Sequence, residues 1–229
     1  MLLLWYNYNN YNYYYHHYHH YYIQDDALYR EQISKMDFWL NQNFYGIDLS
    51  STYERARVEY FSQAVVGTFP SSALLTSYRT VHSIDFLSVT RDELKSFEIP
   101  FYFAIGIIYI YIYIYISHSL KYISISFAEV TGIMHGLGCW FDIYFDGTTK
   151  QLLLSTGPDS PTTHWYQCRL LLKDPIAVNK GQTISGNLTF DVNDKFSYNI
   201  KLRATLDGTN IESCNLIYLH DQMYNYLHS

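Results

Sequence analysis

The chain has 229 residues, of which 48% are hydrophobic and 16% are charged, enough to fill the core of one large domain or two small ones. Its net charge of -6 and isoelectric point near 5.9 argue against a nucleic-acid-binding protein, which would carry a basic surface. The three cysteines are far apart and form no CxxC pair, so they predict neither a disulfide framework nor a zinc site, and they fit a reducing compartment.

Residues 1–24 form a low-complexity tract of Tyr, Asn and His that contains no Asp, Glu, Lys or Arg. Because such a tract lacks the aliphatic variety of a packed core, we predict a disordered tail. Clustered histidines could bind a metal ion, but a repetitive tract offers no scaffold to fix their geometry, so we predict no metal site. The histidines concerned are His16, His17, His19 and His20.

Residues 25–63 are predicted to form two short helices. Apolar side chains spaced four, three and four residues apart indicate an amphipathic helix capped by Asp25 or Asp26. These side chains are Tyr29, Ile33, Met36 and Leu40. A capping-box pattern over residues 51–54 (STYE) predicts the start of a second helix. The two helices carry more aromatic surface than they can bury against each other, so they either fold back onto the chain's own sheet or contact another surface.

From about residue 64 the chain is predicted to be mainly β. Residues 80–87 and 96–103 flank a polar turn that is typical of a hairpin. Residues 137–145 alternate between apolar and polar side chains, and a clearer hairpin spans residues 184–206 around an Asn-Asp-Lys turn. Many short strands at regular spacing predict an antiparallel barrel or sandwich.

Residues 99–120 are uncharged and include an alternating Ile-Tyr run at 108–116. A membrane-spanning helix is one interpretation, but Pro100, Gly106 and the β-branched alternation oppose it. A strand with Tyr on one face and Ile on the other is a second interpretation. The third is a translated repeat, because the dinucleotide repeat TATATA encodes alternating Tyr and Ile.

His164 and Trp165 lie where a proline-containing loop enters a predicted strand. By composition alone such a pair is more often structural, with the ring covering a core and the imidazole bonding a carbonyl. The alternative is that both side chains face a partner, because residues at such an edge are held rigidly.

Three segments, in order, resemble the type I protein arginine methyltransferases, in particular the coactivator-associated (histone) branch. Residues 154–167 (LSTGPDSPTTHWYQ) are similar to the Thr-His-Trp loop of that family. Residues 43–50 (NFYGIDLS) and 135–142 (HGLGCWFD) are similar to two further segments. The resemblance stops after residue 103 and resumes at 127. We therefore expect a non-native insert at about 104–126, such as a retained intron.

The resemblance implies a domain organisation. The low-complexity tail of residues 1–24 precedes a helical dimerisation arm at 25–63, and a β-barrel at 64–229 follows with the insert within it. In the family, a separate Rossmann-like domain binds S-adenosylmethionine through a glycine-rich turn, and two glutamates grip the substrate guanidinium. Neither motif is found in this chain: Gly136 and Gly138 lie in a strand pattern, which indicates packing. We therefore expect no cofactor to bind this chain alone.

The resemblance also implies roles for individual residues. His164 would be an accessory catalytic residue that orients an acidic partner from the missing domain. Trp165 and Thr163 would belong to the substrate-binding wall. Six residues of the arm would contact the second subunit: Tyr29, Ile33, Phe38, Trp39, Phe44 and Tyr45.

The expected function is thus that of the C-terminal part of a histone arginine methyltransferase, in the nucleus and cytoplasm, inactive by itself. The expected partner is a second copy or a full-length subunit, and the complete enzyme would act on arginine-containing proteins such as histones. No nucleic acid or membrane partner is expected. The alternatives are a non-catalytic dimerisation or binding module and a membrane-tethered β domain that uses residues 99–120.

Overall fold

The structure, a computed structural model, describes residues 14–75, 80–84, 88–104, 109–116, 119–126, 131–146 and 148–224. It is mainly β, with two α-helices and three short 3-10 helices among these residues. The helical elements are α1 (Asp26–Asp37), η1 (Phe38–Leu40), η2 (Ser50–Thr52), α2 (Tyr53–Phe61) and η3 (Ser71–Ala73). The strands are β1 (Tyr14–Ile23), β2 (Gln63–Gly67), β3 (Thr80–Ile84), β4 (Ser96–Ala104), β5 (Tyr109–Ile116), β6 (Ser119–Ser126), β7 (Gly132–Asp146), β8 (Gln151–Ser155), β9 (Gln167–Val178), β10 (Thr183–Val192), β11 (Tyr198–Leu206) and β12 (Glu212–Tyr224).

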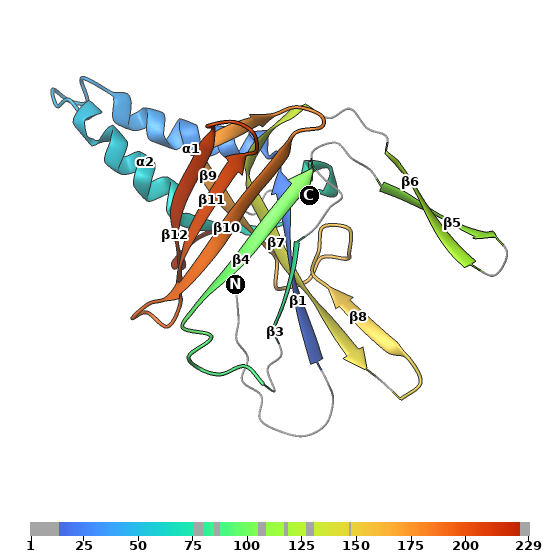
Figure 1. The fold of residues 1–229 in the computed structure, drawn as a ribbon. Coiled ribbons are helices and arrows are strands. Elements are labelled where there is room, and N and C mark those ends of the chain that lie inside the picture. The colour runs from blue at the N-terminus through green and yellow to red at the C-terminus, as the bar shows by residue number, and fades with distance from the viewer. Residues whose placement is uncertain are drawn as a thin grey trace.

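Ten strands form one sheet that curls into a nearly closed barrel (Figure 1). Their order is β3-β1-β7-β9-β2-β12-β11-β10-β4, with β8 paired to β7. The pairing of β12 with β2 is parallel, and the other pairs in the sheet are antiparallel. The predicted barrel class is therefore confirmed.

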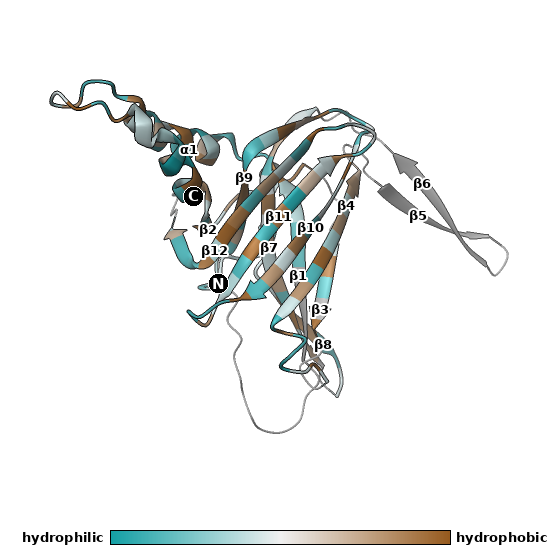
Figure 2. Cartoon of the chain, turned by 60° about the vertical axis from the view of Figure 1, so that its left-hand side comes forward, coloured by the Kyte–Doolittle hydropathy of each residue, from teal (hydrophilic) through white to brown (hydrophobic). Residues whose placement is uncertain are grey.

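Two predicted hairpins have different outcomes. β10 and β11 pair antiparallel from Ile184–Leu206 to Val192–Tyr198, as their alternation indicates (Figure 2). β3 and β4 do not form a hairpin: β3 pairs with β1, whereas β4 pairs with β10. The two strands lie at opposite ends of the strand order, where the barrel nearly closes.

The core has two parts, one on each face of the sheet. The larger cluster fills the inside of the barrel and includes Leu137, Leu188 and Leu202, which have no exposed surface. The smaller cluster lies between the outer face and the helices and includes Phe61 and Met36. The helices are therefore attached to the barrel by an apolar face of their own.

Strand β1 differs from the predicted disordered tail over residues 14–23. It lies between β3 and β7 in the sheet, and its register with β7 continues from Tyr14 to Ile23. Tyr22 faces the barrel interior, and Tyr21 packs in the outer cluster, so residues 19–23 of the strand are buried on both faces. Aromatic rings with polar tips can fill such positions, which is why the strand packs with Ile23 as its one aliphatic side chain. The predicted tail at residues 1–13 lies outside the described residues.

Two histidines of β1, His19 and His20, are buried in the sheet. His19 Nε2 lies 2.7 Å from Asp142 Oδ2, and both side chains are buried. Among the residues that the structure describes, no group of three or more His, Cys, Asp or Glu side chains could hold a metal ion.

The two predicted helices form, but one predicted cap and one predicted apolar contact do not. Asp25 caps α1, because its Oδ1 accepts a hydrogen bond from Leu28 N at 3.0 Å. The capping box at residues 51–54 does not form: the Thr52 hydroxyl donates to Leu49 O at 2.6 Å instead, and α2 begins without a side-chain cap. Leu40 is 48% exposed and does not join the apolar face of the helix. The reason is that α1 ends at Asp37 and the chain continues as the 3-10 helix η1.

Strands β5 and β6 pair with each other as a separate two-stranded sheet. The strand interpretation of residues 109–116 is therefore confirmed over the helical one. In the part of the chain that is described, no helix has the length and apolar character needed to cross a membrane.

Candidate functional site

The Thr-His-Trp loop leads from β8 into β9 at one end of the barrel. His164 is exposed, Trp165 is 40% exposed, and Thr163 is half-buried. Trp165 N donates a hydrogen bond to Thr163 Oγ1 at 3.3 Å, which closes the turn that carries the histidine. Tyr166 follows with a positive φ of 51°, so the chain reverses sharply before β9 begins.

Both ends of this loop are held to the sheet by Thr156 and Gln167. Thr156 Oγ1 donates to Phe141 O at 2.9 Å and accepts from Phe141 N at 3.2 Å. Gln167 Nε2 donates to Thr156 O at 2.9 Å, and Gln167 Oε1 accepts from Phe69 N at 3.0 Å. The sequence offered one signal for Gln167, its place in the Thr-His-Trp motif, but nothing pointed to Phe69, which is 98 residues away.

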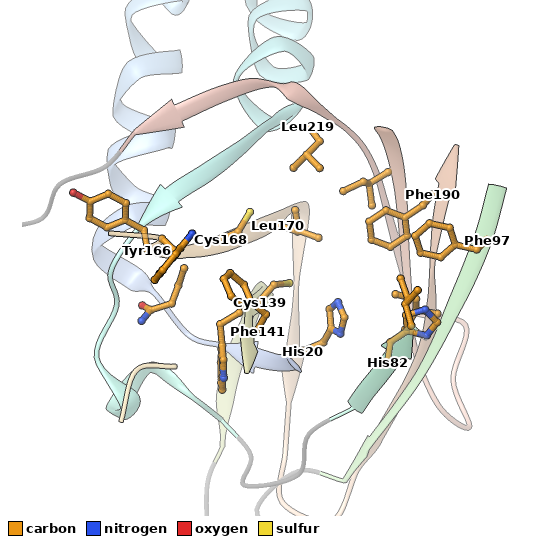
Figure 3. A pocket seen from close by; sticks show the side chains of 16 residues that line it. His20, His82, Phe97, Cys139, Phe141, Tyr166, Cys168, Leu170, Phe190 and Leu219 are labelled. Carbon is orange, nitrogen blue, oxygen red and sulfur yellow. The ribbon is translucent and has the colours of Figure 1, made fainter. Parts of the chain in front are cut away.

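Behind the loop is an apolar cavity of about 70 Å³ in the barrel (Figure 3). Trp165 lines it and contacts Phe141 edge to face, with ring centroids 6.2 Å apart. His20 and His82 also line this cavity. Burial, followed by the neighbouring His82 and His19, lowers the pKa of His20 to about 4. Burial also lowers the pKa of His82, so both imidazoles stay neutral at physiological pH.

The helices project from the barrel as a pair, and we call their far end the arm tip (Figures 1 and 2). The arm tip consists of Phe38, Trp39, Leu40, Phe44, Tyr45 and Ile47. Its aromatic rings pack on one another edge to face, with centroids 4.8–5.4 Å apart. Most of its members are exposed, and Tyr45 is 92% exposed. The tip thus presents apolar surface that nothing in the described part of the chain covers.

Two of the six predicted contact residues lie elsewhere on the arm. Tyr29 packs on Phe61 with centroids 5.5 Å apart, and its hydroxyl donates to Lys173 O at 3.0 Å. Ile33 packs against the outer core cluster. The structure therefore separates the predicted set into inward residues, Tyr29 and Ile33, and tip residues.

A buried ion pair fixes the base of the arm. Arg169 on β9 has no exposed surface, and its Nη1 donates to Asp25 Oδ2 at 2.8 Å. His135 on β7 adds a second link, since its Nδ1 accepts from Asp25 N at 3.1 Å. At the other helix Arg57 pairs with Asp174. These contacts join segments more than 100 residues apart, so no local pattern predicts them.

Gly136 and the carboxylate pair Asp92 and Glu93 each have a structural role in their surroundings. A Cβ on Gly136 would lie 2.1 Å from Leu170 O, so this glycine allows β7 and β9 to approach, as the packing interpretation predicts. Glu93 Oε2 accepts from Thr90 N and Thr90 Oγ1, both at 2.7 Å, and Asp92 pairs with Lys95 at 2.6 Å. This carboxylate pair is engaged locally within an exposed turn.

Comparison with known proteins agrees with this architecture. A family model described as the arginine methyltransferase oligomerization subdomain matches residues 19–207. The chain therefore belongs to the arginine methyltransferase family and contains its C-terminal oligomerization subdomain.

Its relatives include the histone-arginine methyltransferases CARMER of Drosophila ananassae and Drosophila willistoni, which are 36% and 35% identical over 202 residues. These matches cover 88% of this chain but only 34% and 33% of the relatives, so the chain spans about a third of their length.

Two solved structures share the fold. The Trypanosoma brucei PRMT1 enzyme-prozyme heterotetrameric complex with AdoHcy superposes with a TM-score of 0.61 and 16% identity, over 89% of this chain and 57% of that one. Arabidopsis thaliana protein arginine methyltransferase 10 superposes with a TM-score of 0.64 and 17% identity, over 90% and 60%.

Proposed function

We propose that this chain is the C-terminal part of an S-adenosylmethionine-dependent histone arginine methyltransferase that forms asymmetric dimethylarginine. In this proposal the chain supplies the Thr-His-Trp loop and the dimerisation arm and is inactive alone. S-adenosylmethionine would bind a Rossmann-like domain encoded elsewhere, which would also supply the two glutamates. Histone substrates would place the complete enzyme in the nucleus, and the family resemblance extends this proposal to the cytoplasm.

The observation that carries this proposal is the exposure of His164 on a loop whose two ends are hydrogen-bonded to the barrel. An imidazole held in this way can pair with a carboxylate of an adjoining domain and keep that carboxylate oriented toward a guanidinium. Trp165 beside it offers a flat apolar surface to the substrate arginine. His164 is thus a positioning residue, because it acts through the carboxylate it holds.

The arm tip supports the second half of the proposal. Exposed aromatic rings at the end of a projecting helical pair are typical of a protein–protein contact. A second copy or a full-length methyltransferase subunit would cover them, and the relatives named above suggest histones as substrates of the complete assembly.

A split-enzyme experiment tests this function. The chain is co-expressed with the upstream region of the Drosophila ananassae relative, and methylation of a histone peptide by S-adenosylmethionine is measured together with the product isomer. We expect no activity from the chain alone, activity with asymmetric dimethylarginine from the pair, and a roughly 10- to 100-fold loss with His164→Ala, as for other residues that orient a functional side chain. His220→Ala is the matched control, because His220 is also exposed but lies on β12.

Two results would contradict the proposal. Methylation by the chain alone would show that it carries its own cofactor site. A stable complex whose activity does not respond to His164→Ala, or that never methylates, would instead favour a non-catalytic dimerisation module.

A further inference from the structure

Two cysteines lie directly opposite each other on neighbouring strands beside the Thr-His-Trp loop. Cys139 of β7 and Cys168 of β9 are partners in the antiparallel register of the two strands. Cross-strand partners project from the same face of a sheet, and both cysteines line the cavity behind Trp165 (Figure 3). Both are free thiols and are half-buried.

The register brings the two Cα atoms within the range that a disulfide requires. Directly opposed residues of an antiparallel pair have Cα atoms roughly 4.5–5.5 Å apart, and a disulfide needs a Cα separation of about 4.4–6.8 Å. The irregularity in the pairing of β7 with β9 lies between Met134 and Gly136, outside this position. The third cysteine, Cys214, is exposed on β12 opposite Arg203, so its register offers it no cysteine partner.

A buried histidine lies beside the cysteine pair. His20 of β1 is the register partner of Cys139 on the other side, so a row of His, Cys and Cys crosses three adjacent strands. His20 is buried, and its Nδ1 has no hydrogen-bond partner among the described residues. Burial raises the pKa of both thiols, and for Cys139 the adjacent Cys168 raises it further, so both resting groups are protonated.

We propose that Cys139 and Cys168 form an oxidation site that closes into a cross-strand disulfide. The oxidant is a small peroxide, because the adjoining cavity of about 70 Å³ has room for a molecule the size of hydrogen peroxide. This function is independent of the methyltransferase assignment, since it rests on the register of β7 and β9.

The chemistry proceeds in two steps. The thiolate of one cysteine attacks a peroxide oxygen, the O–O bond breaks, and a sulfenic acid and one water form after proton transfer. The second cysteine then attacks the sulfenic sulfur, the S–O bond breaks, and a second water leaves. The two thiols lose two electrons and two protons in total, and one hydrogen peroxide is reduced to two waters. The raised thiol pKa makes the first step slow, so oxidation requires sustained peroxide exposure.

The disulfide would stiffen the base of the Thr-His-Trp loop. Cys168 is the second residue of β9, which begins as the loop ends. Phe141, two residues after Cys139, contacts Trp165. Joining the two sulfurs therefore ties β9, where the loop ends, to β7, to which Thr156 at the start of the loop is hydrogen-bonded.

The experiment uses the purified full chain. The reduced chain is incubated with hydrogen peroxide, unfolded in the presence of N-ethylmaleimide so that buried thiols are also trapped, digested and examined by mass spectrometry. We expect a peptide pair linked through Cys139 and Cys168, reversed by dithiothreitol. The oxidised chain should also melt roughly 5–10 °C higher than the reduced chain, because the crosslink restricts the unfolded state.

Single variants supply the matched controls. Cys139→Ser and Cys168→Ser should each abolish the linked peptide, whereas Cys214→Ser should leave both the link and the rise in melting temperature unchanged. The proposal is overturned if Cys139 and Cys168 are both recovered alkylated under peroxide exposure that oxidises Cys214, or if the recovered link joins Cys214. This outcome is read on the wild-type chain, so it does not depend on how the variants fold.

Discussion

Asp25 shows how a single residue joins the arm to the barrel. One carboxylate oxygen caps α1, and the other accepts from Arg169 at 2.8 Å. Arg169 has no exposed surface, and its Nε and Nη2 have no hydrogen-bond partner among the described residues. The carboxylate is therefore the main compensation for a buried positive charge, which is costly to leave unpaired.

Replacing Asp25 should accordingly destabilise the fold strongly. We expect Asp25→Ala to lower the free energy of unfolding by about 3–5 kcal/mol, because it leaves a buried guanidinium unpaired and removes a helix cap. Asp25→Asn should keep the cap and lose only the charge. Urea unfolding measures both, with the exposed neighbour variant Asp26→Ala as control. A loss below about 1 kcal/mol for Asp25→Ala would refute this account of the pair.

His20 makes stability depend on pH. Its pKa falls from 6.5 to about 4 on folding, so the folded state binds the proton less readily than the unfolded state. The contribution of His20 to the unfolding free energy is fully present above pH 6.5. It is lost as the pH falls toward 4, which lowers the unfolding free energy by about 3 kcal/mol. After burial, the positive charges of protonated His82 and His19 lower the pKa of His20 further, and the pKa of His82 is itself lowered by burial. We expect His20→Gln to flatten the pH profile of the unfolding free energy between pH 6.5 and 4, and an unchanged profile would exclude His20 as its source.

In the helical pair, some aromatic side chains pack against the barrel and others are exposed at the arm tip. Tyr29 faces the barrel, whereas Tyr45 lies at the arm tip, 92% exposed. A tyrosine therefore has a different role at each of the two positions. One contributes to folding, and under the proposed function the other contributes to association.

Paired variants separate these two roles. Tyr45→Asp should weaken self-association at least tenfold in sedimentation velocity while the melting temperature stays the same, because a charge is placed at a surface that a partner would cover. Tyr29→Ala should instead lower the unfolding free energy by about 2–4 kcal/mol. Phe196→Asp is the control, since Phe196 is fully exposed on a β turn away from the arm. Equal association of wild type and Tyr45→Asp would remove the arm tip from the interface.

The approach of β7 to β9 depends on a glycine. A Cβ at Gly136 would meet the backbone of Leu170 at 2.1 Å, whereas a Cβ at Gly208 would meet nothing within 4 Å. Gly208 has a φ of 74°, so alanine there is strained but not crowded. We expect Gly136→Ala to cost about 2–4 kcal/mol of unfolding free energy and Gly208→Ala about 1 kcal/mol, measured by urea unfolding. Similar costs at both sites would show that β7 can shift to admit a side chain.

For the molecule as a whole, the ten-stranded sheet is complete without β5 and β6. Among the described strands, β5 and β6 pair only with each other. The strands that precede and follow them belong to the large sheet: β4 pairs with β10, and β7 pairs with β1, β8 and β9. The folding unit defined by hydrogen bonding is therefore the barrel with its helical pair. This arrangement fits the interpretation of residues 104–126 as an insert in a strand connection.

Deleting residues 104–126 should leave the barrel intact. We expect the unfolding free energy to change by less than about 1 kcal/mol, because loop-closure entropy depends only weakly on loop length. The far-ultraviolet circular dichroism spectrum and the melting temperature test this, with solubility compared in parallel. Loss of cooperative unfolding in the deletion variant would show that the segment belongs to the native fold, and transcripts that join residue 103 directly to 127 would identify it as an intron.

Much of the architecture follows from local patterns. The alternation in residues 184–206 predicts β10 and β11, and residues 25–63 predict two helices, the first capped by Asp25 or Asp26, of which the structure selects Asp25. The Thr-His-Trp loop is also evident from its motif, and His164 is exposed as a partner-facing residue should be. Composition predicts a disordered tail over residues 1–24, but residues 14–23 form strand β1, and the Tyr and His side chains of residues 19–22 are buried in the sheet.

Sequence alone determined the class of the chain, the position of its helices and its family resemblance, because periodicity and motif order are local properties. Tertiary structure decided which strands are neighbours. It placed β1 beside β7, paired Arg169 with Asp25, and set Cys139 opposite Cys168. The physical reason is that register and burial depend on contacts between segments far apart in the chain, whose free energy no local window contains.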